Sequence, residues 1–315
     1  MSAGFVAAAD EVYRLQNGRD DESQFLQRMA NQGHYRNAGG TRQGIYVCTP
    51  GGRLLASVNS NQPDVVMQTL KRGLTEWQSL SEVDRMAGAT SVRPSGRWER
   101  LIPDDGLVLR STIRDLEALE DGRFKPRRRW NRDYVLYSRS EMTAWLPEEL
   151  RDTDGVAVAD PRLRLARFHF VDNARGQALP FHADDVVLDF EPSNVAYRKG
   201  RLVRFRINGA TKAYSDGTWR MGDSVWKPSA GLPYGMVTRV SGWAEYDLTS
   251  KRFTRFELSV LGRFSGRTLF NGRRRDEPEG YVGWTFELVG DPRAALIAPT
   301  FIELYDAAWI KAGVK

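Results

Sequence analysis

The sequence predicts an α+β fold in which a small mixed domain precedes a larger, mostly antiparallel β-domain. Three observations carry this prediction. The 315 residues are enough for two domains of ordinary size. Apolar residues recur at helical spacing mainly near the N-terminus. From about Leu163 onward, apolar and polar residues alternate with a period of two, which is typical of strands with one buried and one solvated face.

Composition indicates a soluble protein with a sizeable core. Hydrophobic residues make up 41% of the chain, and 46 Lys and Arg exceed 40 Asp and Glu only modestly. No stretch approaches the roughly 18 apolar residues of a membrane-spanning helix, so we expect no membrane association. The start lacks the basic segment of a signal peptide. We expect a cytoplasmic protein if Met1 is native and an exported one if a leader has been removed, while the oligomeric state stays open.

The elements of the first domain follow in order. Phe5 to Ala9 can form a short buried strand. A helix is expected from Asp20 or Asp21, which are good N-caps, to about Gln32, with Gly33 as its stop. Residues 44–59 form two short strands around a Pro-Gly-Gly turn. Pro63 then begins a second helix, whose apolar face is formed by Val66, Leu70, Leu74 and Trp77.

This order resembles the later part of a thioredoxin-like fold, over about residues 1–80. The motif Gly-Ile-Tyr-Val-Cys-Thr-Pro-Gly-Gly-Arg-Leu-Leu-Ala at 44–56 is similar to the hairpin of uncharacterised bacterial thioredoxin-like proteins, including large ones with a second, β-rich domain. The chain departs from working thioredoxins twice. Where the family places Cys-x-x-Cys, this chain has Glu-Val-Tyr-Arg-Leu at 11–15, which contains no thiol. Where the family keeps a cis-proline before the hairpin, it has Thr-Arg-Gln-Gly at 41–44. The resemblance therefore implies a redox-inactive scaffold, because Cys48 is the only cysteine.

The domain boundary is expected in the Gly-, Pro- and Ser-containing segment 81–97, a linker between domain 1–80 and the β-rich domain 98–315. A strand is expected at 107–113, a short helix near 140–147 and a C-terminal helix at 299–311. Alternating strands are expected at 186–190, 203–207, 256–260 and 284–288, with turns at 198–200, at Asn208-Gly209, at 215–217 and at 247–251. A meander of this kind can close into a barrel or a sandwich.

Two histidines and two carboxylates in the β-domain are the candidate catalytic residues: His169, Asp172, His182 and Asp185. If the segment 173–176 turns the chain back, His169 and His182 could meet an Asp and hold a divalent metal. Their spacing matches no metal motif, so structural histidines are the competing interpretation, and we otherwise expect no cofactor. Two clusters of cations, one at 125–130 and one at Arg263, Arg267 and 273–275, are the candidates for binding phosphate or nucleic acid. Solvated loops or internal ion pairs are their competing interpretation.

The sequence lacks the nucleophile elbow, the phosphate loop, the H-E-x-x-H motif and the dinucleotide fingerprint. Our first hypothesis is therefore a non-catalytic protein whose thioredoxin-like scaffold supports a β-barrel that binds a small apolar ligand or a protein partner. The alternative is an enzyme, a metal-assisted hydrolase or an oxidoreductase, that uses the His/Asp residues. Binding of nucleic acid or phosphate through the arginines is a weaker alternative.

Overall fold

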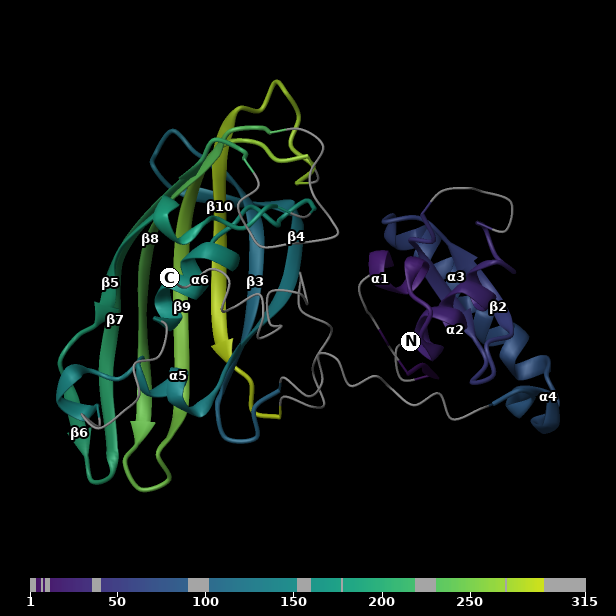
Figure 1. Cartoon of the computed structure of the whole chain (residues 1–315), viewed down its shortest axis with the longest axis horizontal. Coiled ribbons are helices and arrows are strands. Elements are labelled where there is room, and N and C mark those ends of the chain that lie inside the picture. The colour runs from purple at the N-terminus through teal and green to yellow at the C-terminus, as the bar shows by residue number, and fades with distance from the viewer. Residues whose placement is uncertain are drawn as a thin grey trace. The chain divides into compact units, whose positions relative to one another are not determined.

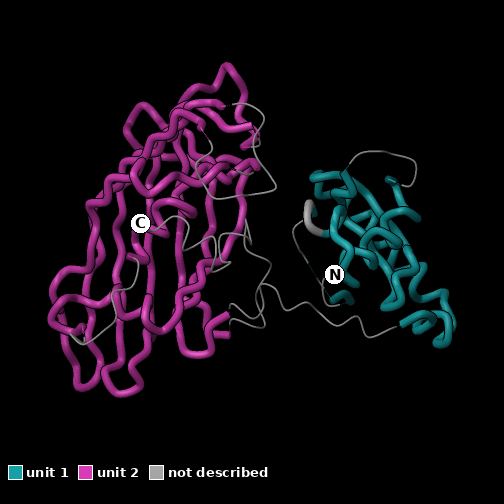
Figure 2. The backbone as a smooth tube through the Cα atoms, in the orientation of Figure 1, with its two compact units in different colours: residues 1–97 teal, residues 98–315 magenta. Residues whose placement is uncertain are grey.

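The computed structural model describes residues 4–6, 8, 12–35, 41–89, 102–151, 160–176, 178–218, 231–269 and 271–291. The chain divides into two compact units, residues 1–97 and 98–315, coloured separately in Figure 2. The expected C-terminal helix at 299–311 lies outside the described residues.

The first unit pairs a hairpin with helices. Strands β1 (Ile45–Cys48) and β2 (Leu54–Val58) form a two-stranded antiparallel sheet, as the sequence predicts. Its helices are α1 (Val12–Asn17), α2 (Asp21–Ala30), α3 (Pro63–Ser79) and α4 (Glu82–Met86). Asp20 caps α2 by accepting a hydrogen bond from the Ser23 amide at 2.9 Å, and Pro63 opens α3.

Close packing joins α3 to the hairpin through Gly73. A Cβ at Gly73 would lie 2.7 Å from the Val47 side chain, so only glycine lets the helix approach β1 this closely. The expected strand at the start of the chain is wrong for its described residues, since Phe5 and Val6 are not in a strand and Val6 is 99% exposed. With two strands in its sheet, this unit leaves the thioredoxin-like prediction unconfirmed.

The second unit is built on one large antiparallel sheet (Figure 1). Its eight strands have the order β4-β3-β10-β9-β8-β7-β5, with β6 also paired to β7. The strands are β3 (Leu107–Ala118), β4 (Phe124–Tyr137), β5 (Val186–Pro192), β6 (Tyr197–Lys199), β7 (Leu202–Ser215), β8 (Tyr234–Asp247), β9 (Arg252–Gly266) and β10 (Glu279–Leu288). The expected antiparallel meander is confirmed. The described strands of this unit form one sheet that stays open between β4 and β5, so the expected barrel is wrong, and they do not form the two sheets of the alternative sandwich.

Short helices cover one face of this sheet, which we call the inner face. They are α5 (Arg139–Thr143), η3 (Glu148–Leu150), α6 (Pro161–Phe168) and η4 (Ala183–Asp185). In Figure 1, α5 and α6 lie within the curve of the strands. Helix α5 confirms the short helix expected near 140–147, whereas α6 lies where the sequence predicts the change to strands. An open, curved sheet needs such a cover, because otherwise its apolar face would meet water.

Two further expectations are corrected by the sheet. Asn208-Gly209 is not a turn but lies inside the 14-residue strand β7. A Cβ at Gly209 would lie 2.1 Å from the Asp189 carbonyl oxygen. The absence of a side chain at Gly209 therefore allows β5 to lie close to β7 at this point. The basic cluster 125–130 is not a loop but part of the edge strand β4.

Candidate functional site

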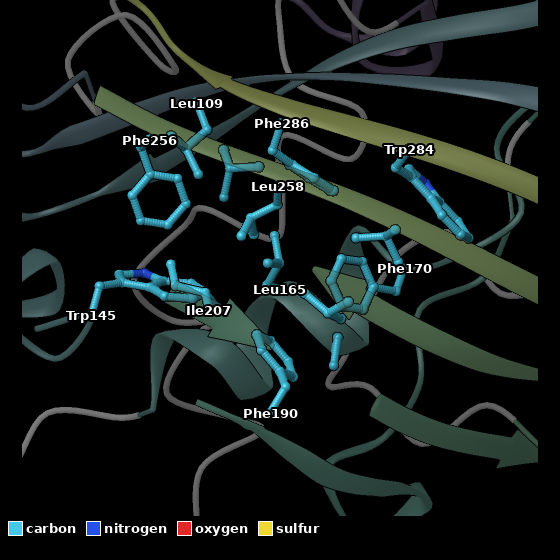
Figure 3. Close-up of a cluster of buried hydrophobic side chains, with 14 of the residues drawn as sticks. Leu109, Trp145, Leu165, Phe170, Phe190, Ile207, Phe256, Leu258, Trp284 and Phe286 are labelled. Carbon is cyan, nitrogen blue, oxygen red and sulfur yellow. The ribbon is translucent and has the colours of Figure 1, made fainter. Parts of the chain in front are cut away.

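The inner face of the sheet is filled by side chains. Trp145, just after α5, is fully buried and meets the ring of Phe256 edge-on at a centroid distance of 5.3 Å. Phe170, just after α6, packs in the same way on Phe286 at 5.7 Å. Figure 3 shows these rings directed toward the strands, with Leu165 and Ile207 among them. The sheet interior is therefore a packed core, and it is not the place for the ligand that a barrel could have held.

The two histidines expected at a shared site have different partners. His169 ends α6, is 5% exposed, and places its Nδ1 3.3 Å from Oδ2 of Asp133 on β4. His182 caps η4, and its Nδ1 lies 3.3 Å from Oδ2 of its near neighbour Asp184. Asp185 is half-buried in the same turn. Two of the four predicted site residues, His182 and Asp185, are joined only as near neighbours in this turn, by a hydrogen bond from the Asp185 N–H to the His182 carbonyl oxygen at 3.1 Å.

Asp172 belongs instead to a buried ionic cluster. Arg273 forms a two-pronged pair with it, from Nε to Oδ2 at 2.6 Å and from Nη2 to Oδ1 at 2.7 Å. The same guanidinium reaches Oδ1 of Asp115 on β3 at 2.5 Å and lies 4.1 Å from the ring centroid of Phe264. Arg175 completes the cluster by bridging Asp115 and Glu277, each at 2.5 Å. The cluster ties the loop after α6 and the β9–β10 loop to β3.

The pKa values of two carboxyl groups in this cluster, Asp172 and Glu277, are shifted in opposite directions and by different causes. Burial raises the pKa of the Asp172 carboxyl, and the hydrogen bonds from Arg273 oppose that shift. The hydrogen bond from Arg175 lowers the pKa of the half-buried Glu277. Because both arginines satisfy carboxylates on more than one element, we interpret the cluster as a structural clamp.

The described residues form no recognisable metal site. Among the described residues, no group of three or more His, Cys, Asp or Glu side chains is arranged to hold a metal ion. A zinc site needs at least three such ligands within about 2.3 Å of the ion. The described surroundings of His169 and His182 therefore offer no support for the divalent metal, and the catalytic role of the four residues stays a prediction.

A cleft opens beside α5, with a volume of about 770 Å³. Its apolar wall comprises Pro103, Leu146, Leu150, Tyr246 and Leu248. Its polar rim comprises Asp105, Ser138, Arg139, Ser140, Thr143 and Lys251. We call this site the α5 cleft. Its volume is within the usual range for pockets that hold small molecules, roughly 300–1,000 Å³.

Local structure fixes both sides of the α5 cleft. On one side, Ser138 and Glu141 form a reciprocal capping box at the start of α5, and Arg164 holds Glu141 at 2.7 Å. On the other side, Asp247 fixes the β8–β9 turn by accepting hydrogen bonds from the amides of Thr249 at 2.8 Å and Ser250 at 3.2 Å. The rim is therefore carried by two anchored turns.

Cations outnumber carboxylates among the described residues that line the α5 cleft. Arg139 and Lys251 are the two cations, and Asp105 is the one carboxylate. The contact between Arg139 and Asp105 is loose, at 3.8 Å, and the Asp105 side chain is 54% exposed. Such a pair contributes little and gives way easily to a competing anion. The cleft can thus receive a molecule with an apolar body and an anionic group.

The two arginine clusters have different structural roles. Arg263 pairs with Glu279 at 2.5 Å, Arg274 with Asp276 at 3.1 Å, and Arg273 belongs to the clamp. Internal ion pairs therefore account for these three arginines. Cluster 125–130 lies on β4 with its side chains exposed.

Cys48 lies at the end of β1 and is partly buried. Burial raises the pKa of its thiol, so the reactive thiolate is less populated at neutral pH than in free cysteine. His34 stacks on Tyr46, the residue two before Cys48, with a centroid distance of 5.1 Å. These contacts favour a structural role for Cys48.

Comparisons with protein-family models, with curated proteins and with solved structures found no match. In the described part of the chain, no helix combines the length and the apolar character needed to cross a membrane.

Sequence reasoning missed the α5 cleft. Arg139 and Lys251 are 112 positions apart and belong to no motif. The capping pattern of Ser138 and Glu141 was the one local signal, and it indicates a helix start rather than a binding site.

Proposed function

We propose that this chain is a non-catalytic binding protein whose β-rich unit holds a small amphiphilic ligand, with an anionic group, in the α5 cleft. The observation that carries the proposal is the combination, among the described lining residues, of an apolar wall with two cations and one carboxylate. The apolar wall would take the body of the ligand, and Arg139 and Lys251 would take its anionic group.

The contacts of the candidate catalytic residues favour binding over catalysis. A general acid or base must reach the proton that it transfers. His169 and Asp172 are each 5% exposed and are engaged with Asp133 and Arg273. The packed inner face also favours a ligand in the cleft over one within the sheet.

A pair of matched amphiphiles tests the proposal. Dodecanoate and dodecyltrimethylammonium, both below their micellar concentrations, share one chain and differ in the sign of the head group. We expect calorimetric titration of the full chain to give one binding site for dodecanoate and much weaker binding of the cation. Arg139→Gln should weaken dodecanoate binding about tenfold or more, since a hydrogen bond to a charged group contributes roughly 1.5–3 kcal/mol.

Two further variants define the outcome. Thr143→Trp should abolish binding, because the indole ring would fill the cleft that Thr143 lines. Arg255→Gln, on the far face of the sheet, should bind dodecanoate like the unmodified protein. Equal affinity for the two amphiphiles, or full affinity in Thr143→Trp, would refute the proposal.

A further inference from the structure

The hairpin formed by β3 and β4 concentrates the positive charge of the chain. Residues 114–132 hold seven Lys and Arg against four Asp and Glu, a net charge of +3 and half of the +6 of the whole chain. One of these acids, Asp115, is buried in the clamp and so does not offset the surface charge. The surface of this hairpin is therefore more basic than its sequence alone indicates.

Three consecutive arginines lie in a bulge of this hairpin. The pairing of β3 with β4 places Arg114 opposite Trp130 and Leu116 opposite Pro126. Two steps along β3 thus correspond to four along β4, and Arg127, Arg128 and Arg129 have no Cα partner in the register. We call these three residues the arginine bulge. Bulges re-aim side chains and are frequent at functional sites.

The arginine bulge is scarcely neutralised. Arg127 lies 3.9 Å from Glu117, with both side chains about half exposed, at 46% and 47%. No ion pair involves Arg128 or Arg129 among the described residues. The nearby acid Asp121 is engaged with Arg123 at 2.6 Å. Three cations on an edge strand, whose one ion pair among the described residues is the loose contact with Glu117, form a surface suited to a chain of phosphates.

An exposed aromatic ring adjoins the arginine bulge. Trp130 is 49% exposed, and the guanidinium of Arg132 lies 5.6 Å from its ring centroid. An exposed tryptophan beside phosphate-binding cations offers a stacking platform for an unpaired base. Trp243, elsewhere on the sheet, has more cations on its ring than Trp130 has. The guanidinium groups of Arg204 and Arg255 lie 4.7 Å and 5.1 Å from its centroid.

We propose that the arginine bulge and Trp130 bind single-stranded nucleic acid, with the arginines on successive phosphates and Trp130 stacked on a base. A peptide that adds a strand to the edge of β4 fits less well. Pro126 has no N–H to donate, and a bulge interrupts the regular ladder that an added strand needs. The proposal concerns a different surface from the α5 cleft, so either can fail without the other.

Fluorescence anisotropy of the full chain with labelled 15-nucleotide oligo-dT and oligo-U tests this inference. We expect both to bind in 50 mM salt and to be released steeply toward 200 mM. Arg128→Gln/Arg129→Gln should weaken binding at least tenfold and reduce the slope of log K against log salt by about 1.4, from two lost phosphate contacts. A preference for one oligonucleotide would identify DNA or RNA as the source of the ligand.

Trp130→Ala separates a nucleic acid from any other polyanion. The variant should bind both oligonucleotides about tenfold more weakly, since stacking contributes roughly 1–3 kcal/mol per base. Its affinity for inorganic polyphosphate should be unchanged. Arg239→Gln, on β8, is the matched control and should leave all affinities unaltered. Absence of binding at 50 mM salt, an unaffected double variant, or an unaffected Trp130→Ala would overturn the inference.

Discussion

The two faces of the eight-stranded sheet follow the same register, but the inner face is mostly apolar and the outer face mostly polar. One cross-strand row on the inner face reads Ser111, Phe286, Leu258, Gly242 and Ile207, with one polar member. The next row, on the outer face, reads Thr112, Thr285, Ser259, Ser241 and Asn208. The inner row is covered by helices, whereas the strand residues of the outer row are mostly exposed. The difference indicates that the inner face determines stability, while recognition is left to the rim and the edges of the sheet.

The largest expected effect lies on the inner face. Trp145→Ala should lower the free energy of unfolding of the β-rich unit by about 3–5 kcal/mol, because it leaves a large cavity between Tyr137 and Phe256. Trp145→Phe should cost much less, since it fills most of this space and the Trp145 Nε1–H has no hydrogen-bond partner among the described residues. Urea denaturation of both variants measures the difference. Equal, small losses would mean that the inner face is loosely packed.

The second-largest expected loss of stability follows from breaking the clamp formed by Asp115, Asp172, Arg175, Arg273 and Glu277. Arg273→Gln leaves Asp172 without its partner and should cost about 3 kcal/mol, the lower end for a broken buried pair, because Arg175 still neutralises Asp115. Arg274→Gln, one residue along, removes only an exposed pair and should change stability by less than about 0.5 kcal/mol. A similar loss in both variants would contradict the distinction between a buried clamp and a solvated loop.

Acid should weaken the clamp through Glu277. Its pKa is lowered by Arg175, so this carboxylate stabilises the folded state above its unfolded pKa of about 4.3, and the contribution is lost as pH falls through the lower folded pKa. Asp172 acts in the opposite direction, because burial raises its pKa. Comparison of the unmodified protein with Glu277→Gln isolates the contribution of the Glu277 carboxylate to the pH dependence of stability. Between pH 6 and pH 3 the variant should lose less stability than the unmodified protein, and an equal loss would count against the ion pair.

The smallest effect is expected on the outer face. Arg255→Gln removes a guanidinium that lies 5.1 Å from the Trp243 ring, and Arg204 at 4.7 Å remains on the same ring. We expect a change in unfolding free energy within about 0.5 kcal/mol. A loss above 2 kcal/mol would show that the outer face contributes to stability as the inner face does.

Period-two alternation was sufficient to predict the antiparallel strands, because each strand has one buried and one wet face. The same pattern gave no information on closure, since an open sheet under helices and a closed barrel bury the same alternate residues. Helix α6 was missed because it is buried and rich in arginine, with Arg164 and Arg167 packed on rings and bonded to carbonyl groups. For Arg167, burial lowers the guanidinium pKa to about 10, and Asp184 and Asp185 oppose this.

The sites were harder to predict than the strands. The partners of Asp172 lie far along the chain, with Arg273 removed by 101 residues, so no local spacing reveals the clamp. The arginine cluster at 125–130 was visible as composition, but its bulge depends on the register with β3. The α5 cleft joins two turns whose proximity only the folded sheet creates.

Hydrogen–deuterium exchange of the full chain with and without dodecanoate tests the central claim, that a ligand binds beside α5 and not within the sheet. The account predicts slower amide exchange in segments 138–150 and 246–251, with unchanged exchange at the centres of β7 and β10. Saturating dodecanoate that leaves both segments unchanged, or that alters the exchange of β7 and β10 instead, would contradict it.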